Sequence, residues 1–158
     1  MSAEDAIGEL SQRIDDRTAF VGLGNRDRGD DAFGLRFVDD LEHLDPGRFL
    51  SEEDGLESVI LQLVNDKEVR KVIFIDSCDL GSRPGDSALL RLDSIDETIS
   101  THKIPLSMLM ALLQNVGKET WLFGVQPKSL EFGSDMSSEA KRSLEQLEAT
   151  VKSRLKGL

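Results

Sequence analysis

Residues 19–35 read AFVGLGNRDRGDDAFGL, an apolar run followed by two glycines, a charged loop and an acid pair. The apolar run predicts a strand that is buried on both faces, as strands of a parallel sheet are. Gly22 and Gly24 release the backbone for a tight turn behind that strand. Asp30 and Asp31 then stand directly before an apolar pattern of helical period. This order of strand, loop and helix places the acid pair at the edge of a sheet where α/β proteins bind their ligands.

The acid pair has two interpretations. Carboxylates at the start of a helix accept hydrogen bonds from free backbone N–H groups and interact favourably with the helix dipole. One of the two carboxylates can instead point into the crevice beyond the strand. Taken alone, Asp31 is more simply a helix cap or a surface acid, so a functional role depends on which groups lie beside it.

Strand and helix patterns alternate along the rest of the chain. The expected strands are 18–23, 71–76, 88–92 and 120–125, with 49–50 a short edge strand or a loop, and the expected helices are 3–15, 32–44, 56–64, 105–116 and 137–155. This alternation predicts a three-layer α/β sandwich, with a mainly parallel twisted sheet of about five strands flanked by helices on both faces. The strand from Ala88 follows its neighbour without an intervening helix, which favours an antiparallel position at one edge.

Length and composition restrict the function classes. The 158 residues fit one domain, 1–158, in which residues 1–16 are expected to form an additional N-terminal helix outside the main pattern. The net charge of −11 argues against a nucleic-acid partner or an anionic membrane surface. The single cysteine excludes an intrachain disulfide framework and favours a reducing compartment. Because the sequence has no signal-peptide core and no run of membrane-spanning length, we expect a cytoplasmic location and no membrane insertion.

Three polar residues stand where such a sheet would form a site. Asp31 follows the first strand, Asp76 ends the central apolar strand, and His102 precedes the helix that begins near Pro105. Two carboxylates and an imidazole combine hard oxygen donors with one borderline nitrogen, a set that suits a divalent first-row metal ion. Each residue alone has a simpler interpretation, as a cap, a turn former or a solvated histidine. The set has a function only if the fold brings all three together.

Other chemistries find less support in the sequence. Cys78, two residues after Asp76, could act as a nucleophile with His102 as its base, although a lone cysteine at a strand end is more often a packing residue. The Gly22-Leu23-Gly24 turn is similar to the start of a dinucleotide-binding fingerprint but lacks its third glycine. The chain has neither a P-loop nor the Gly-x-Ser-x-Gly elbow of a serine hydrolase.

Four segments together resemble the hydrogenase maturation endopeptidases, which trim the C-terminal extension of the large subunit of nickel–iron hydrogenases. The segments follow the order of that family and cover nearly the whole domain. They are GLGN with GDDAFG (22–25 and 29–34), FIDSCD with Pro84-Gly85 downstream (74–79), STHKIPL (100–106) and FGVQPKSL (123–130). The Thr-His and Gly-Val-Gln-Pro forms are most similar to the branch that processes energy-converting and formate-linked hydrogenases and their archaeal relatives.

The resemblance implies an aspartic-type endopeptidase, a hydrolase, whose partner is a nickel–iron hydrogenase large-subunit precursor. The family's metal-contacting acid falls on Asp31, its second acid on Asp76 and its histidine on His102. These residues would sense nickel already inserted in the precursor, after which one peptide bond near its C-terminus is cut. The implied metal is therefore the nickel of the substrate, with another divalent ion as an alternative occupant of the isolated protein. Two chemistries stay open: the metal polarises the scissile carbonyl and activates water, or Asp31 or Asp76 acts as general base.

Two departures from the family pattern motivate alternatives. Segment 49–55 is unusually polar for the family and its expected glycine-bearing part is reduced to Gly55, while the N-terminal helix is additional. A reshaped cleft favours a second hypothesis, a non-proteolytic metal-checking chaperone or binding module for the precursor. A third hypothesis is a nucleotide-binding domain that uses the Gly22–Asn25 turn.

Overall fold

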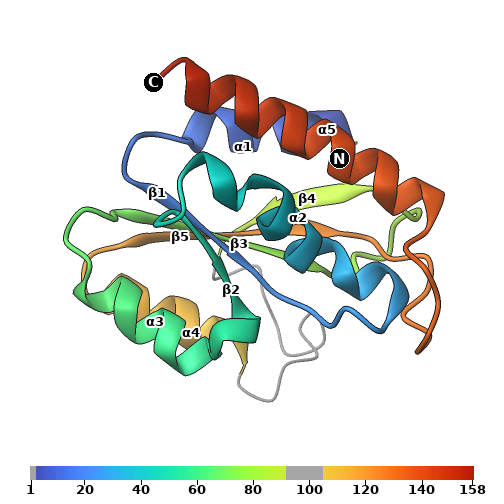
Figure 1. Cartoon of the computed structure of the whole chain (residues 1–158), viewed down its shortest axis with the longest axis horizontal. Coiled ribbons are helices and arrows are strands. Elements are labelled where there is room, and N and C mark those ends of the chain that lie inside the picture. The colour runs from blue at the N-terminus through green and yellow to red at the C-terminus, as the bar shows by residue number, and fades with distance from the viewer. Residues whose placement is uncertain (1–2, 92–104) are drawn as a thin grey trace.

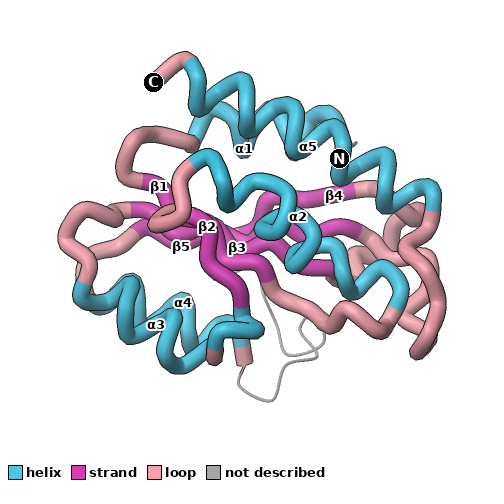
Figure 2. Tube along the Cα trace, viewed as in Figure 1, coloured by secondary structure: helices cyan, strands magenta, loops and turns pink. Residues whose placement is uncertain are grey.

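The computed structural model describes residues 3–91 and 105–158, and these residues form a sheet covered by helices on both faces (Figures 1 and 2). The strands are β1 Thr18–Gly22, β2 Phe49–Ser51, β3 Lys71–Ser77, β4 Ser87–Leu90 and β5 Glu119–Val125. The helices are α1 Ala3–Arg13, α2 Phe33–Leu41, α3 Leu56–Asn65, α4 Leu106–Asn115 and α5 Ser138–Lys156, with single 3-10 turns η1 Gly29–Ala32, η2 Glu42–Leu44 and η3 Glu52–Asp54.

The sheet of the described residues has the strand order β2-β1-β3-β5-β4, and only the edge strand β4 runs antiparallel to its neighbour. Strands β1 and β3 lie next to each other in its middle, with Gly22 opposite Ile75. Their side chains are apolar almost throughout because helices cover both faces of a parallel sheet. The predicted three-layer α/β class and the antiparallel edge strand are both confirmed.

The two faces of the sheet carry different layers. Figure 1 shows α1, α2 and α5 on one face and α3 and α4 on the other. Alternate residues of β3 contribute to the two cores: Ile73 and Ile75 pack with the first layer, and Val72 and Phe74 with the second. This alternation follows from the two-residue repeat of a strand.

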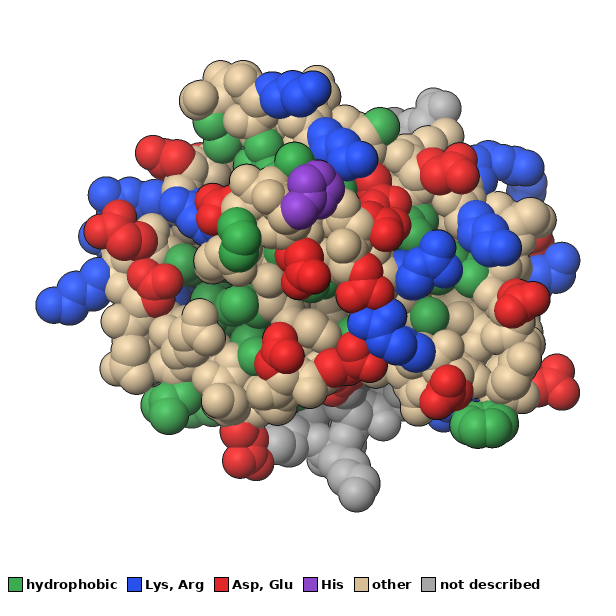
Figure 3. Space-filling model, viewed as in Figure 1, with side chains coloured by type: hydrophobic (Ala, Val, Ile, Leu, Met, Phe, Trp, Pro, Cys, Tyr) green, Lys and Arg blue, Asp and Glu red, His purple; other side chains and the backbone are tan. Residues whose placement is uncertain are grey.

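The layer of α3 and α4 carries few charges. The sequence of α3, LESVILQLVN, contains one charged residue, Glu57, and that of α4, LSMLMALLQN, contains none. The charged residues of the chain therefore concentrate elsewhere. In Figure 3, acidic and basic side chains mix over the middle of the visible face, without a continuous patch of either sign.

The structure adds detail at two segments. The expected N-terminal helix contributes to the core: Ile7, Leu10 and Ile14 are buried, and α1 contacts β4 and α5. The polar segment 49–55 does form a strand over Phe49–Ser51, because the ring of Phe49 stacks on Phe20 with centroids 5.1 Å apart. The buried ring of Phe49, which also contacts Phe37, and the partly buried Leu50 hold this short strand against the core.

Helix α2 is shorter than the predicted 32–44, since it begins at Phe33, ends at Leu41 and continues only as the η2 turn. The final helix matches its prediction closely, with Ser137 as N-cap accepting a hydrogen bond from the Ala140 N–H at 3.2 Å. Among residues 3–91 and 105–158, no helix has the length and apolar character needed to cross a membrane.

Candidate functional site

Two of the three predicted site residues lie together at the carboxyl ends of the central strands. Asp31 belongs to η1, the turn that leads from the β1 loop into α2, and Asp76 is the penultimate residue of β3. Because β1 and β3 are neighbouring parallel strands, the segments that follow them meet at the same edge of the sheet. The side chain of Asp76 is buried, whereas Asp31 is half-buried.

Ser77 connects the two carboxylates. Its hydroxyl donates a hydrogen bond to Asp31 Oδ1 at 2.7 Å, and its backbone N–H donates to Asp76 Oδ1 at 2.8 Å. Both carboxylates therefore bond the same residue, and a cation near two like charges relieves their mutual repulsion. Ser77 was not among the predicted site residues, and the signal that could have found it is its position directly after Asp76.

Two glycines let the Asp31 loop and α2 close onto the sheet. Gly24 has φ of +136°, and a Cβ atom there would overlap the backbone carbonyl oxygen of Asp31. The next N–H, that of Asn25, donates to the same Asp31 oxygen at 3.0 Å. A Cβ atom at Gly34, in the first turn of α2, would overlap the carbonyl oxygen of Ile75. No other residue type fits these approaches, which explains the glycines on either side of the acid pair.

The acid pair does not cap α2 through a side chain. Neither η1 nor α2 has a side-chain cap hydrogen bond, because the chain enters α2 through a 3-10 turn. Asp30 instead points away from α2 to the connection between β5 and α5. There its carboxylate accepts from the backbone N–H of Lys128 at 2.7 Å, and from the N–H and hydroxyl of Ser137 at 2.6 and 2.8 Å. The capping interpretation of the pair is thus corrected: Asp30 anchors a distant loop.

Cys78 lies beside the carboxylates but is not an activated thiol. Its side chain is 3% exposed and packs against Gly124, where a Cβ atom would come within 2.8 Å of its sulfur. Burial raises the pKa of the Cys78 thiol well above its ordinary value, and the charges of Asp76 and Asp31 raise that pKa further. A neutral buried thiol is a poor nucleophile, so the packing interpretation is favoured.

His102, the third predicted ligand, lies outside the described residues. Within the described ranges, no group of three or more His, Cys, Asp and Glu side chains is arranged to hold a metal ion. The segment that carries His102 joins β4 to α4, and α4 begins at Leu106 directly after Pro105. The sequence-based set of three is therefore placed in part, as the pair of Asp31 and Asp76.

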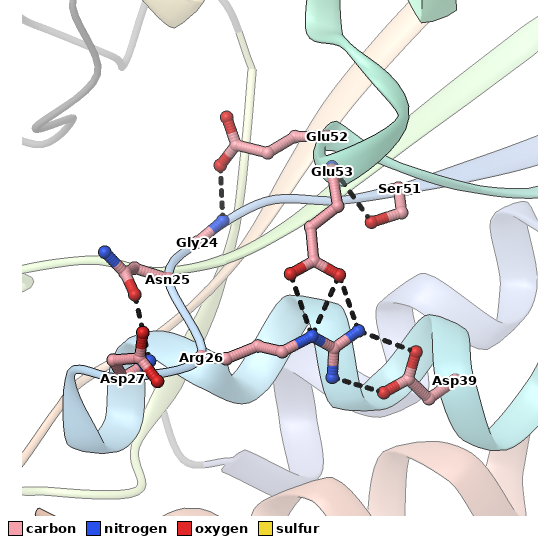
Figure 4. A network of polar contacts seen from close by, with 8 residues as sticks. All are labelled: Gly24, Asn25, Arg26, Asp27, Asp39, Ser51, Glu52 and Glu53. Carbon is pink, nitrogen blue, oxygen red and sulfur yellow. Dashed lines mark hydrogen bonds and ion pairs between the residues drawn. The ribbon is translucent and has the colours of Figure 1, made fainter. Parts of the chain in front are cut away.

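A network of polar contacts surrounds the loop that leads to Asp31 (Figure 4). Glu52 Oε1 accepts a hydrogen bond from the Gly24 N–H at 2.6 Å. The guanidinium of Arg26 contacts both Glu53 oxygens at 2.8 Å through Nε, and both Asp39 oxygens at 2.5 and 2.9 Å through its terminal nitrogens. The Gly24 N–H already donates to a carboxylate, so it is not available to bind a phosphate oxygen. This disfavours nucleotide binding at the turn.

Comparison with known proteins places the chain among hydrogenase maturation proteases. The profile of the HycI hydrogenase maturation protease family matches residues 57–154. The hydrogenase 3 maturation protease of Escherichia coli is 28% identical over 139 residues, and the match covers 85% of this chain and 86% of that protein.

Solved structures agree with the family match. The crystal structure of a NiFe hydrogenase maturation protease HycI from Thermococcus kodakarensis has a TM-score of 0.79 and 26% identity, and covers 94% of this chain and 99% of that one. The solution structure of the endopeptidase HycI from Escherichia coli has a TM-score of 0.71 at 23% identity, and covers 84% of this chain and 86% of that one. This second likeness concerns the fold.

Proposed function

This chain belongs to the hydrogenase maturation protease family and is a peptidase, and we propose that its substrate is a nickel–iron hydrogenase large-subunit precursor. In this proposal it removes the C-terminal extension of the precursor after nickel insertion. It recognises the inserted nickel through Asp31, Asp76 and His102. A cytoplasmic location and a lack of nucleic-acid partners are part of the proposal, supported by the net charge of −11 and the single cysteine.

The observation that supports the metal-recognition step is the pairing of Asp31 and Asp76 around Ser77. Carboxylate oxygens are ligands that divalent cations accept, and an imidazole is a common ligand for nickel. In a pair of like charges, a cation relieves the repulsion that burial strengthens. Nickel belongs here to the substrate, so a precursor that lacks it presents nothing to the pair.

Hydrolysis of a peptide bond needs a group that takes a proton from the attacking water and a group that protonates the leaving amine. We assign the first role to Asp31, because its half-buried carboxylate is more accessible to water than the buried Asp76. The same carboxyl can then give its proton to the leaving nitrogen. Asp76 contributes charge and, through the Ser77 segment, orientation of Asp31.

The test is incubation of the protein with nickel-loaded and nickel-free precursor, followed by intact-mass measurement of the large subunit. We expect a mass loss equal to the C-terminal extension with the nickel-loaded precursor alone. Absence of cleavage by the wild type, or equal cleavage of both precursors, would contradict the proposal. Asp54→Asn is a matched control, since Asp54 is an exposed acid in η3 that takes no part in the contacts of Ser77 with Asp31 and Asp76.

A second function has one observation in its favour. The segment after β2 is a 3-10 turn with three acidic residues, and Glu52 of that turn reaches the Asp31 loop. A cleft altered in this way could bind the precursor without cutting it, as a metal-checking chaperone does. Stable co-elution of the protein with nickel-loaded precursor, together with an unchanged precursor mass, would support this function over proteolysis.

A further inference from the structure

The segment that joins β2 to α3 bears on the site through Glu52. We propose that Glu52 is a positioning residue for Asp31, and that its carboxylate fixes the backbone of the 24–31 loop through the Gly24 N–H. The proposal rests on the role of Asp31 in the proposed function. Glu52 acts through the loop, and it is not assigned a contact with the substrate.

A short chain of contacts leads from Glu52 to Asp31. Glu52 Oε1 lies 2.6 Å from the Gly24 nitrogen, which is a short hydrogen bond for a backbone N–H donor. Gly24 packs so closely on the Asp31 backbone that a side chain there would overlap the Asp31 carbonyl oxygen. A shift of the Gly24 peptide therefore moves Asp31 directly.

Asp31 is held from two sides in this arrangement. Ser77 orients its carboxylate by a hydrogen bond of 2.7 Å to Oδ1. On the backbone side, the Asn25 N–H bonds the Asp31 carbonyl oxygen at 3.0 Å, and Glu52 holds the preceding peptide. Hydrogen-bond partners behind a ligand of this kind set its direction and basicity.

The neighbouring Arg26 contacts are a weaker support for the same loop. Arg26 bridges Glu53 of η3 and Asp39 of α2, but its side chain is 40% exposed. Exposed ion pairs of this kind are screened by water and salt. Glu52 is half-buried, so its hydrogen bond to the Gly24 N–H is less screened by water than the Arg26 ion pairs (Figure 4).

Three variants separate positioning from other roles: Glu52→Ala, Glu52→Gln and the control Asp54→Asn. Glu52→Ala removes the acceptor, and we expect kcat for precursor cleavage to fall about 10-fold, with KM within about twofold. Glu52→Gln keeps an oxygen acceptor and should restore kcat to within about threefold of the wild type. Asp54→Asn removes one charge from the same turn and should cleave at the wild-type rate.

Three outcomes would overturn the inference. These are wild-type cleavage by Glu52→Ala, a loss as large in Glu52→Gln as in Glu52→Ala, and a rise in KM without a change in kcat. The last would mean that Glu52 contacts the substrate.

A second measurement does not need a cleavable substrate. Hydrogen exchange of peptides that cover residues 24–31 should be about 10-fold faster in Glu52→Ala than in the wild type, and nearly unchanged in Glu52→Gln. Equal exchange in all variants would overturn the inference. If the wild type fails to cleave while this exchange difference is present, the proposed function fails and the positioning of the loop by Glu52 stands.

Discussion

Asp30 and Asp31 are adjacent in sequence, yet they serve two different regions of the molecule. Asp30 is 1% exposed, and its carboxylate accepts three hydrogen bonds from the β5–α5 connection. Asp31 is half-buried, and among residues 3–91 and 105–158 its carboxylate accepts one hydrogen bond, from Ser77. A carboxylate that fixed donors contact at both oxygens is structural, whereas one with most of its lone pairs left over can bind a cation or take a proton.

The 3-10 turn explains the separation of the two side chains. Such a turn has three residues per revolution, so neighbouring side chains point about 120° apart. An acid pair in η1 therefore reaches two regions at once, the sheet edge at Asp76 and the loop that precedes α5. Because the two carboxylates serve separate regions, substitution of one should leave the role of the other intact.

The largest effect is expected at Asp31. Asp31→Asn keeps the size of the side chain and removes its charge and basicity, so we expect precursor cleavage to fall by about 10³-fold. The midpoint of thermal unfolding should stay within about 2 °C, because no buried charge loses its partners. Cleavage assays and thermal scans of the same preparation check both parts, and undiminished cleavage would remove Asp31 from the site.

Substitution of Asp30 should reduce the stability of the protein instead of its catalytic step. Asp30→Ala leaves the N–H of Lys128 and both donors of Ser137 without their acceptor in a buried place. We expect the free energy of unfolding to drop by about 3 kcal/mol, measured by urea denaturation. Residual folded protein should still bind nickel-loaded precursor at low temperature. A free energy within about 0.5 kcal/mol of the wild type would show that the anchor is dispensable.

Substitution of Ser77 should reduce both precursor cleavage and stability, each to a smaller extent than the two changes above. Ser77→Ala removes the hydroxyl that orients Asp31 but leaves the backbone N–H that bonds Asp76. We expect cleavage to fall about 10-fold and stability by about 1 kcal/mol. Ser77→Thr retains the hydroxyl and is the matched variant, with recovery of activity as the expected result. Equal activity in Ser77→Ala and the wild type would mean that Asp31 needs no such orientation.

Asp40 of α2 and Glu148 of α5 form a further pair of acids, away from the sheet edge. Substitution in this pair has the smallest expected effect. Burial and the Asp40 carboxyl raise the pKa of Glu148 on α5 to about 8, against the opposing charges of Lys152 and Arg36. A carboxyl whose pKa is raised by folding binds more protons in the native state. Its contribution to stability is therefore present below its ordinary pKa of 4.5 and is lost as the pH rises to about 8.

Glu148→Gln should remove this pH dependence. Because the group is partly exposed, screening limits the effect to about 1 kcal/mol between pH 5 and pH 9. Urea denaturation at several pH values should show a stability of the wild type that declines over this range and a flatter profile for the variant. Parallel profiles would show that Glu148 and Asp40 ionise independently.

Much of this architecture could be predicted from local patterns. The apolar run of β3 and the acids that follow β1 and β3 are signals within a few residues, and parallel strands bring their ends together whatever the details of packing. The same local signals could not tell Asp30 from Asp31, because their partners lie at residues 128 and 137 for one and at residue 77 for the other.

Glu52 had no signal in the sequence. Its contact with Gly24 spans 28 residues and depends on how β2, held by the stacked ring of Phe49, pairs with β1. The burial of α1 was missed for a related reason. Its apolar stripe predicted an amphipathic helix, but only the arrangement of β4 and α5 shows what that stripe covers.

The hydrogen-bond partners of Asp30 come much later in the sequence, which has a consequence for synthesis of the chain. Lys128 and Ser137 follow Asp30 by 98 and 107 residues, so a ribosome releases the acid pair long before it makes the groups that hold Asp30. Until α5 begins to emerge, the turn that carries Asp31 lacks its anchor, although β1, β2 and β3 have all left the exit tunnel. A nascent chain arrested before residue 137 would therefore contain both Asp31 and Asp76 without the native support of their turn.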